Sequence, residues 1–145
     1  MNPRLRASAS IVAARWIAIA VASSVAVTLV VVAHSQGAGP SEARGVTTKP
    51  LGAIDLANEV EGMSGRQLRA RLVTIEPGGH VALHSHKDRP TMEYVIQGQP
   101  VEIRNGIEIS HQPGDLVIAT REVSHWWENR GTTPVVLLPV DIYKP

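Results

Sequence analysis

A chain of 145 residues has room for one folded domain with an appendage, but not for two domains. Its formal net charge of +1 excludes the strongly basic surface that is typical of nucleic-acid-binding proteins. The absence of cysteine excludes a disulfide framework and a thiolate metal site.

The N-terminal segment is basic at first and then strongly apolar. Residues 1–15 contain three arginines and no acidic residue, and residues 16–33 contain no charge. An apolar run of this length is short for a membrane span and long for a cleaved signal. We therefore expect an N-terminal apolar helix within residues 1–33, either a signal peptide or an anchor in the cytoplasmic membrane. Both place the following domain in the periplasm or outside the cell. A buried core helix is the less favoured alternative, because neither face of the segment is polar.

Small and polar residues dominate the next stretch, 34–50, which also contains two prolines. Such a composition cannot bury enough apolar surface to become ordered, so it predicts a flexible linker. The folded domain is expected to span residues 51–145.

Short strands and tight turns are predicted beyond residue 51. Apolar residues alternate with arginines over 68–72, which predicts a half-buried strand that ends at the Pro77 turn. The next strand is expected to carry histidines, and a hairpin is predicted around Asn105-Gly106. The remaining predicted strands are 91–97, 116–119, 124–129 and 135–143. With no convincing helix of ten residues, the pattern indicates an all-β sandwich or small barrel.

Two histidines stand out in the strand after the turn. His84 and His86 are two residues apart, so in a strand both imidazoles point to the same side. Such a pair can hold one transition-metal ion, because neutral imidazole is its commonest protein ligand. The alternative is an exposed strand with two polar residues facing outward, and the pair alone does not decide between them.

The order of glycines, histidines and turns resembles the cupin superfamily. The first cupin motif has a glycine, a His-x-His pair, a glutamate and a second glycine, and the second motif ends in a histidine followed four residues later by an asparagine. The matching residues are Gly78, His84, His86, Gly98, Gly114, His125 and Asn129. The resemblance extends from about residue 52 to residue 141. It implies a double-stranded β-helix, that is, a jelly-roll barrel.

The chain departs from the family pattern at the position of the metal-binding glutamate. Thr91 occupies that position, and a hydroxyl is a poor substitute for a carboxylate. Glu93 lies two residues later and therefore shares the face of Thr91. The proline and glycine of the second motif are replaced by Thr120 and Glu122, which indicates a reshaped loop before His125.

The resemblance implies a metal site formed by His84, His86 and His125. Glu93 is then a candidate fourth ligand, or a hydrogen-bond acceptor beside the ligands. Three histidines with open coordination positions suit Fe, Mn, Ni, Cu or Zn as a divalent cofactor. Thr91 is expected to line the pocket.

Several nearby side chains have alternative interpretations. Trp127 shares the face of His125 and is expected to form a wall of the pocket, or else to pack in the core. His80 lies in the turn and has only a small chance of touching the metal, and His111 is expected to be solvated. Residues 87–89 form a charged loop at the mouth, which could guide an anionic ligand or simply be solvated.

Two classes of function follow from this site. One is a metal-dependent enzyme, for which the resemblance suggests a small-molecule dioxygenase with Glu93 as the candidate general base. The other is a non-catalytic module that binds or senses a small ligand, because the cupin fold hosts many functions. The expected partners are a small-molecule ligand or substrate, the membrane if the N-terminal segment is retained, and a second copy in a homodimer. No nucleic acid is expected.

Overall fold

The computed structural model describes residues 39–145. The apolar helix that the sequence predicts within residues 1–33 therefore lies outside the described residues. Residues 34–38 of the predicted linker also lie outside them. Within residues 39–145 no helix is long and apolar enough to cross a membrane.

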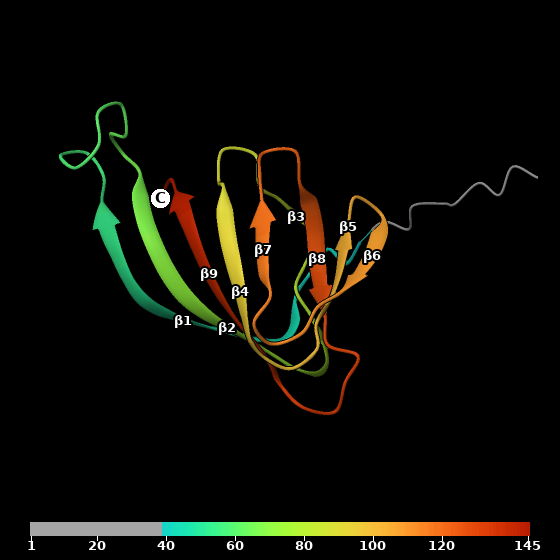
Figure 1. Cartoon of the computed structure of the whole chain (residues 1–145). Helices are drawn as coiled ribbons and strands as arrows, with labels where there is room; N and C mark the ends of the chain where they lie inside the picture. The colour runs from blue at the N-terminus through green and yellow to red at the C-terminus, as the bar shows by residue number, and fades with distance from the viewer. Residues whose placement is uncertain (1–38) are drawn as a thin grey trace, which may run out of the picture. The chain divides into compact units, whose positions relative to one another are not determined.

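Residues 39–145 form strands and loops without a helix, which confirms the all-β prediction (Figure 1). The strands β4, β7 and β9 have the bounds that the sequence predicts. The nine strands are β1 Arg44–Asp55, β2 Gln67–His80, β3 His84–Ser85, β4 Thr91–Gln97, β5 Val101–Arg104, β6 Ile107–Ser110, β7 Leu116–Ala119, β8 Ser124–Glu128 and β9 Val135–Tyr143.

The strands form one curved antiparallel sheet in the order β6-β5-β8-β2-β9-β4-β7 (Figure 1). The long strand β2 joins its two halves, because it pairs with β9 over most of its length and meets β8 only where His80 faces Glu128. β1 pairs with the edge of β2 that does not pair with β9, and the short strand β3 pairs with β8. This curvature gives the sheet an inner side that can enclose a site.

The hairpin of β1 and β2 differs from the sequence prediction. β1 begins at Arg44, inside the range predicted as a linker, because the β-branched residues 46–48 pair with residues 73–75 of β2. β2 also continues through the predicted Pro77 turn to His80. Gly79 permits this, since a Cβ atom there would lie 2.7 Å from the carbonyl oxygen of Arg44.

The apolar core lies on the inner side of the sheet. Its buried members come from β2, β4, β7, β8 and β9: Ile75, Val95, Val117, Trp127, Val135 and Leu137. Gly98 ends β4 with a φ of 82°, and a Cβ there would lie 2.9 Å from the Cα of Val135. The predicted hairpin between β5 and β6 is present, with positive φ angles at Asn105 and Gly106.

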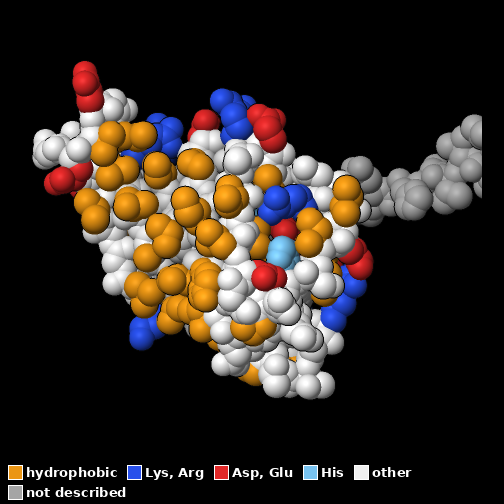
Figure 2. All heavy atoms as spheres, viewed as in Figure 1, with side chains coloured by type: hydrophobic (Ala, Val, Ile, Leu, Met, Phe, Trp, Pro, Cys, Tyr) orange, Lys and Arg blue, Asp and Glu red, His pale blue; other side chains and the backbone are white. Residues whose placement is uncertain are grey.

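The outer side of the sheet is also apolar. On β4 the side chains of Thr91, Glu93 and Val95 are buried on the inner side, whereas Met92 and Tyr94 are 56% and 43% exposed. Leu116 and Ile118 of the neighbouring β7 are likewise exposed. Figure 2 shows hydrophobic side chains spread over this face. The inner side therefore carries the polar candidates for a site, and the outer side is an uncovered hydrophobic surface.

Candidate metal centre

Three histidines converge on the inner side of the sheet. His84 on β3 and His125 on β8 are direct partners in the strand register, so their side chains lie next to each other. His86 follows the end of β3 and is 1% exposed. Its Nε2 atom lies 3.1 Å from Nε2 of His84 and 2.9 Å from Nε2 of His125.

The other ring nitrogen of each histidine has an acceptor, and this determines where the proton lies. Nδ1 of His84 donates to the carbonyl oxygen of Ala82 at 2.9 Å. Nδ1 of His86 lies 3.0 Å from the carbonyl oxygen of Arg89 and 2.8 Å from the Thr91 hydroxyl. With the proton on Nδ1, a neutral imidazole presents an unprotonated Nε2. Each histidine thus directs a lone pair into the shared space.

The arrangement of these nitrogens fits a bound transition-metal ion. Burial lowers the pKa of His84 and of His86 to about 4, so both rings are neutral at pH 7. Lone pairs this close repel one another unless a cation lies between them. Two neighbouring ligands with metal–nitrogen bonds of ~2.1 Å at right angles lie about 3.0 Å apart, which matches the two Nε2 distances.

A carboxylate completes the cluster. Glu93 projects inward from β4, is 5% exposed, and accepts a hydrogen bond of 2.8 Å from Nε1 of Trp127. Glu93 and the three histidines each offer a ligand atom within 4.8 Å of the others. Burial raises the pKa of Glu93, against the lowering influence of His125 and of the Trp127 hydrogen bond. A cation at the centre of the cluster would favour the ionised carboxylate.

Glu102 is a buried member of the site that the sequence analysis did not identify. On β5 it is fully buried, and its carboxylate accepts hydrogen bonds from Nδ1 of His125 at 2.5 Å and from Arg104 at 2.7 Å. Burial alone would raise the pKa of Glu102, but these hydrogen bonds outweigh it and lower the pKa to about 2. An ionised Glu102 orients the His125 ring and makes its Nε2 a stronger ligand.

The remaining predicted residues divide into neighbours of the cluster and residues outside it. Thr91 accepts from Nδ1 of His86 and donates to the carbonyl oxygen of Arg89, so it orients a histidine and does not replace the family's glutamate. Trp127 is buried and lines the cavity. His80, at the end of β2, lies outside the cluster. His111 was expected to be solvated, but it donates from Nε2 to Glu102 at 3.0 Å and packs against Trp127.

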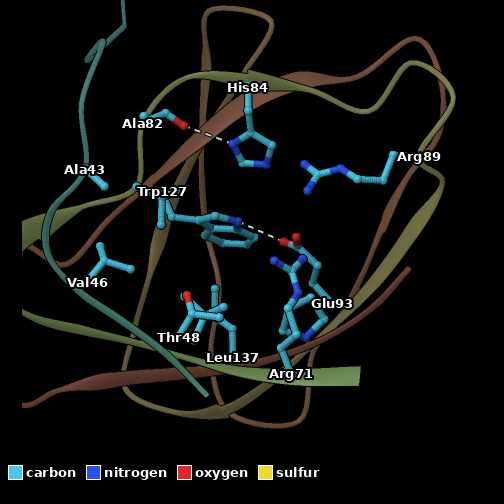
Figure 3. A pocket seen from close by; sticks show the side chains of 13 residues that line it. Ala43, Val46, Thr48, Arg71, Ala82, His84, Arg89, Glu93, Trp127 and Leu137 are labelled. Carbon is cyan, nitrogen blue, oxygen red and sulfur yellow. Dashed lines mark hydrogen bonds between the residues drawn. The ribbon is translucent and has the colours of Figure 1, made fainter. Parts of the chain in front are cut away.

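A cavity of about 300 Å³ adjoins the cluster. His84, Glu93 and Trp127 form its wall on the metal side, as Figure 3 shows. Arg71 and Arg89 also line it, and the remaining lining is mainly apolar. The side chains that could hold an ion therefore face a space large enough for a small organic molecule.

The chain is similar to known proteins in sequence and in fold. The family model described as "Cupin domain" matches residues 71–143. An oxalate-binding protein of Thermotoga maritima is 28% identical over 93 residues, which cover 63% of this chain and 77% of that protein. The fold is similar to that of a Klebsiella pneumoniae protein with a double-stranded β-helix domain, at 20% identity and a TM-score of 0.56 over 71% of this chain and 78% of that one. It is also similar to a Thermus thermophilus protein, at 21% identity and a TM-score of 0.55 over 74% and 90% of the two chains.

Proposed function

The chain belongs to the cupin domain family, and from this premise we propose that it binds one divalent transition-metal ion through His84, His86 and His125. The ion would hold a small molecule in the adjoining cavity. The observation that carries this proposal is the convergence of three unprotonated Nε2 atoms, two of the distances being 2.9 and 3.1 Å. The donor set suits Fe, Mn, Ni, Cu or Zn.

The enzyme form of this proposal is a small-molecule dioxygenase. A bound ion would supply Lewis-acid or redox chemistry at the coordination positions that the histidines leave open. Glu93 would accept a proton from the substrate, because its carboxylate lies beside the cluster and faces the cavity. Burial raises the pKa of Glu93, which makes its carboxylate a stronger base.

The second form is a binding or sensing module without turnover. It is supported by the Thermotoga maritima relative, which is named for binding oxalate and not for a reaction. The cavity and the metal site would have the same roles in both forms. Only a chemical step at Glu93 separates them.

Export of the domain is part of the proposal. It is supported by the basic start of the sequence and by the uncharged stretch 16–33. A signal peptide would release the domain into the periplasm or the medium, whereas an anchor would keep it at the membrane. The expected order is a targeting segment, a tether and the cupin domain.

Elemental analysis of the purified full-length protein tests the metal site. We expect near-stoichiometric metal in the protein and in a His80→Ala control, because His80 lies outside the cluster. The double variant His84→Ala, His86→Ala should hold less than about a tenth of that amount, since it loses two of three strong ligands. Equal metal content in the double variant and the control would refute the site.

Turnover tests the choice between the two forms. Dioxygen consumption would be measured on a panel of small organic acids for the protein and for Glu93→Gln. An enzyme should keep its metal in this variant and lose at least about a hundredfold in rate, because the amide cannot accept the proton. Full activity in Glu93→Gln would contradict the role of the base. No consumption by either protein, together with thermal stabilisation by one of the acids, would support the binding module.

A further inference from the structure

We propose that the cavity beside the metal centre binds a small carboxylic acid with an apolar body, whose carboxylate is held by Arg71 and Arg89. The inference deepens the proposed function and rests on it for the place of the ligand. It assigns a chemical class to that ligand. In Figure 3 both guanidinium groups point toward the space between His84 and Glu93.

Arg71 supplies an unpartnered donor. Its side chain is 19% exposed, and one terminal nitrogen donates to the carboxylate of Asp141 at 2.9 Å. Its Nε atom is buried without a hydrogen-bond partner. The hydrogen bonds of this guanidinium group are therefore incomplete. Because Arg71 lines the cavity, a carboxylate carried by a ligand can pair with the part of the group that faces the cavity.

Arg89 is free to join Arg71. Its nearest acidic partner is again Asp141, at 3.7 Å, which is beyond hydrogen-bonding distance. Arg69 donates hydrogen bonds to both carboxylate oxygens of Asp141, at 2.8 and 3.0 Å. Without an ion, and with Glu93 counted as ionised, three guanidinium groups here face two carboxylates, which leaves one positive charge, and a divalent ion would add two more. The site therefore favours an anionic ligand.

The rest of the cavity is suited to an apolar group. Val46, Val73, Leu137 and Pro139 also line it, together with the ring of Trp127. A volume of about 300 Å³ is at the small end of the range for organic ligands, ~300–1,000 Å³. Oxalate has two carboxylates and no apolar part, so it would leave this wall unused. The lining therefore favours an acid with one carboxylate and a hydrocarbon body.

A carboxylate fits the polar end better than a phosphate does. A phosphate ester carries a charge of about −1.5 to −2 and three acceptor oxygens. Among the described residues, the other polar side chains that line the cavity are Thr48, His84 and Glu93. They leave the third oxygen of a phosphate with few donors, whereas a carboxylate can pair both of its oxygens with one guanidinium group.

Titration calorimetry on the zinc-loaded full-length protein tests the inference with four probes. Benzoate carries one carboxylate on an apolar ring, benzamide is its neutral analogue, oxalate lacks the apolar part, and phenyl phosphate replaces the anion. We expect benzoate to bind at least about tenfold more tightly than each of the other three. Equal binding of benzamide, or tighter binding of oxalate or phenyl phosphate, would overturn the inference.

Matched variants test the two arginines. Arg71→Gln and Arg89→Gln should each weaken benzoate binding by about tenfold or more, because each loses a charge-assisted hydrogen bond. Arg121→Gln is the control, since Arg121 is exposed, pairs with Glu122 and does not line this cavity. It should change binding by less than about threefold, and an effect as large as that of Arg71→Gln would refute the assignment. If Arg71→Gln fails to fold, Arg89→Gln still decides the question.

The zinc content of each sample separates this inference from the proposed function. Zinc bound without any preference for benzoate would refute the inference and leave the metal site standing. A benzoate preference that depends on both arginines, in a protein that takes up neither zinc nor Fe, Mn, Ni or Cu, would refute the metal site and support the anion site.

Discussion

At the scale of single residues, Glu102 shows how a buried carboxylate can control a metal ligand that it does not replace. It contacts His125 on one side and Arg104 and His111 on the other. Arg104 and His111 donate hydrogen bonds to Glu102 and favour its ionised form. The ionised carboxylate in turn favours the proton of His125 on Nδ1. The affinity for the ion should therefore depend on a residue outside the ligand set.

We expect Glu102→Gln to weaken metal binding by about ten- to a hundredfold, because the amide carries no charge to polarise the His125 ring. Competition against a chromophoric chelator would measure the change. Glu108→Gln is the control, since Glu108 is exposed on β6 and pairs with Arg130. Equal affinities of the two variants would show that Glu102 has no effect on the site.

The buried histidines should make the metal-free protein sensitive to acid. The pKa of His84 and of His86 is about 4 in the folded state, against 6.5 for an unperturbed histidine. Between these values the unfolded chain takes up protons that the folded chain refuses, so the free energy of unfolding falls as the pH falls from 6.5 to 4. Glu102, with a pKa of about 2, adds a further loss as the pH falls below 4.5.

Urea unfolding in the presence of EDTA at pH 7 and at pH 4.5 checks this prediction. We expect the protein to lose at least about 2 kcal/mol between the two values. The double variant His84→Gln, His86→Gln should lose clearly less, because its amides do not titrate. Glu93 acts in the opposite direction in both proteins, since its pKa is raised and its protonation favours the folded state at low pH. An equal loss in both proteins would contradict the assignment to the histidines.

At the scale of elements, the shortest strand positions candidate metal ligands. β3 consists of His84 and Ser85 and is held to the sheet only by its pairing with β8. Two of the three histidines of the cluster lie on it or directly after it. An ion bound between β3 and β8 would therefore fasten this two-residue strand to the sheet.

Hydrogen exchange should reveal this dependence. On removal of the metal with EDTA we expect the amides of residues 81–90 to exchange at least about tenfold faster, while the amides of β9 keep their rates. The reason is that β9 pairs with both β2 and β4 along most of its length. Unchanged protection of residues 81–90 would show that β3 is stable without the ion.

Most strand positions could be predicted because their signals are local. Asn105-Gly106 and Gly114 mark turns in which the backbone takes positive φ, and the strands between the turns alternate in polarity. The spacing of His84 and His86 indicates that both imidazoles point to the same side, but it does not decide between a metal site and an exposed strand. His125 entered the expected ligand set only through the resemblance to cupins, because its distance in sequence carries no geometric information.

The side of each strand that is covered could not be predicted from alternation. Leu68 is 36% exposed, whereas the side chain of Arg71 is 19% exposed, because the arginine side of β2 faces buried Asp141 of β9. Glu102 was missed for a related reason. β5 is buried on both sides, so Glu102 and Ile103 are both covered and no period of two remains.

At the scale of the whole domain, the uncovered apolar face predicts a homodimer. The register places Ile118, Met92, Val140 and Ala70 in one row across β7, β4, β9 and β2. The row carries no charge, so the same row of a second copy can pack against it without repulsion. We propose a second copy of this chain as the occupant.

Sedimentation velocity tests this assembly. We expect the protein to sediment as a dimer and Ile118→Glu to sediment as a monomer, because the substitution places a charge within the row. Ile107→Glu is the control, since Ile107 is 66% exposed on β6, outside the row. A monomeric parent protein, or a dimer that survives Ile118→Glu, would refute the proposal.

The position of this row has a consequence for the metal centre. Leu116 and Ile118 also line an outer hollow, whose other walls include Glu102, Arg104 and His111. A second subunit seated on β7 would close that hollow and cover Arg104 and His111, which hydrogen-bond to the buried carboxylate of Glu102. The affinity for the metal ion would then depend on the protein concentration. Dimerisation would thus alter the chemistry at the metal centre of each subunit.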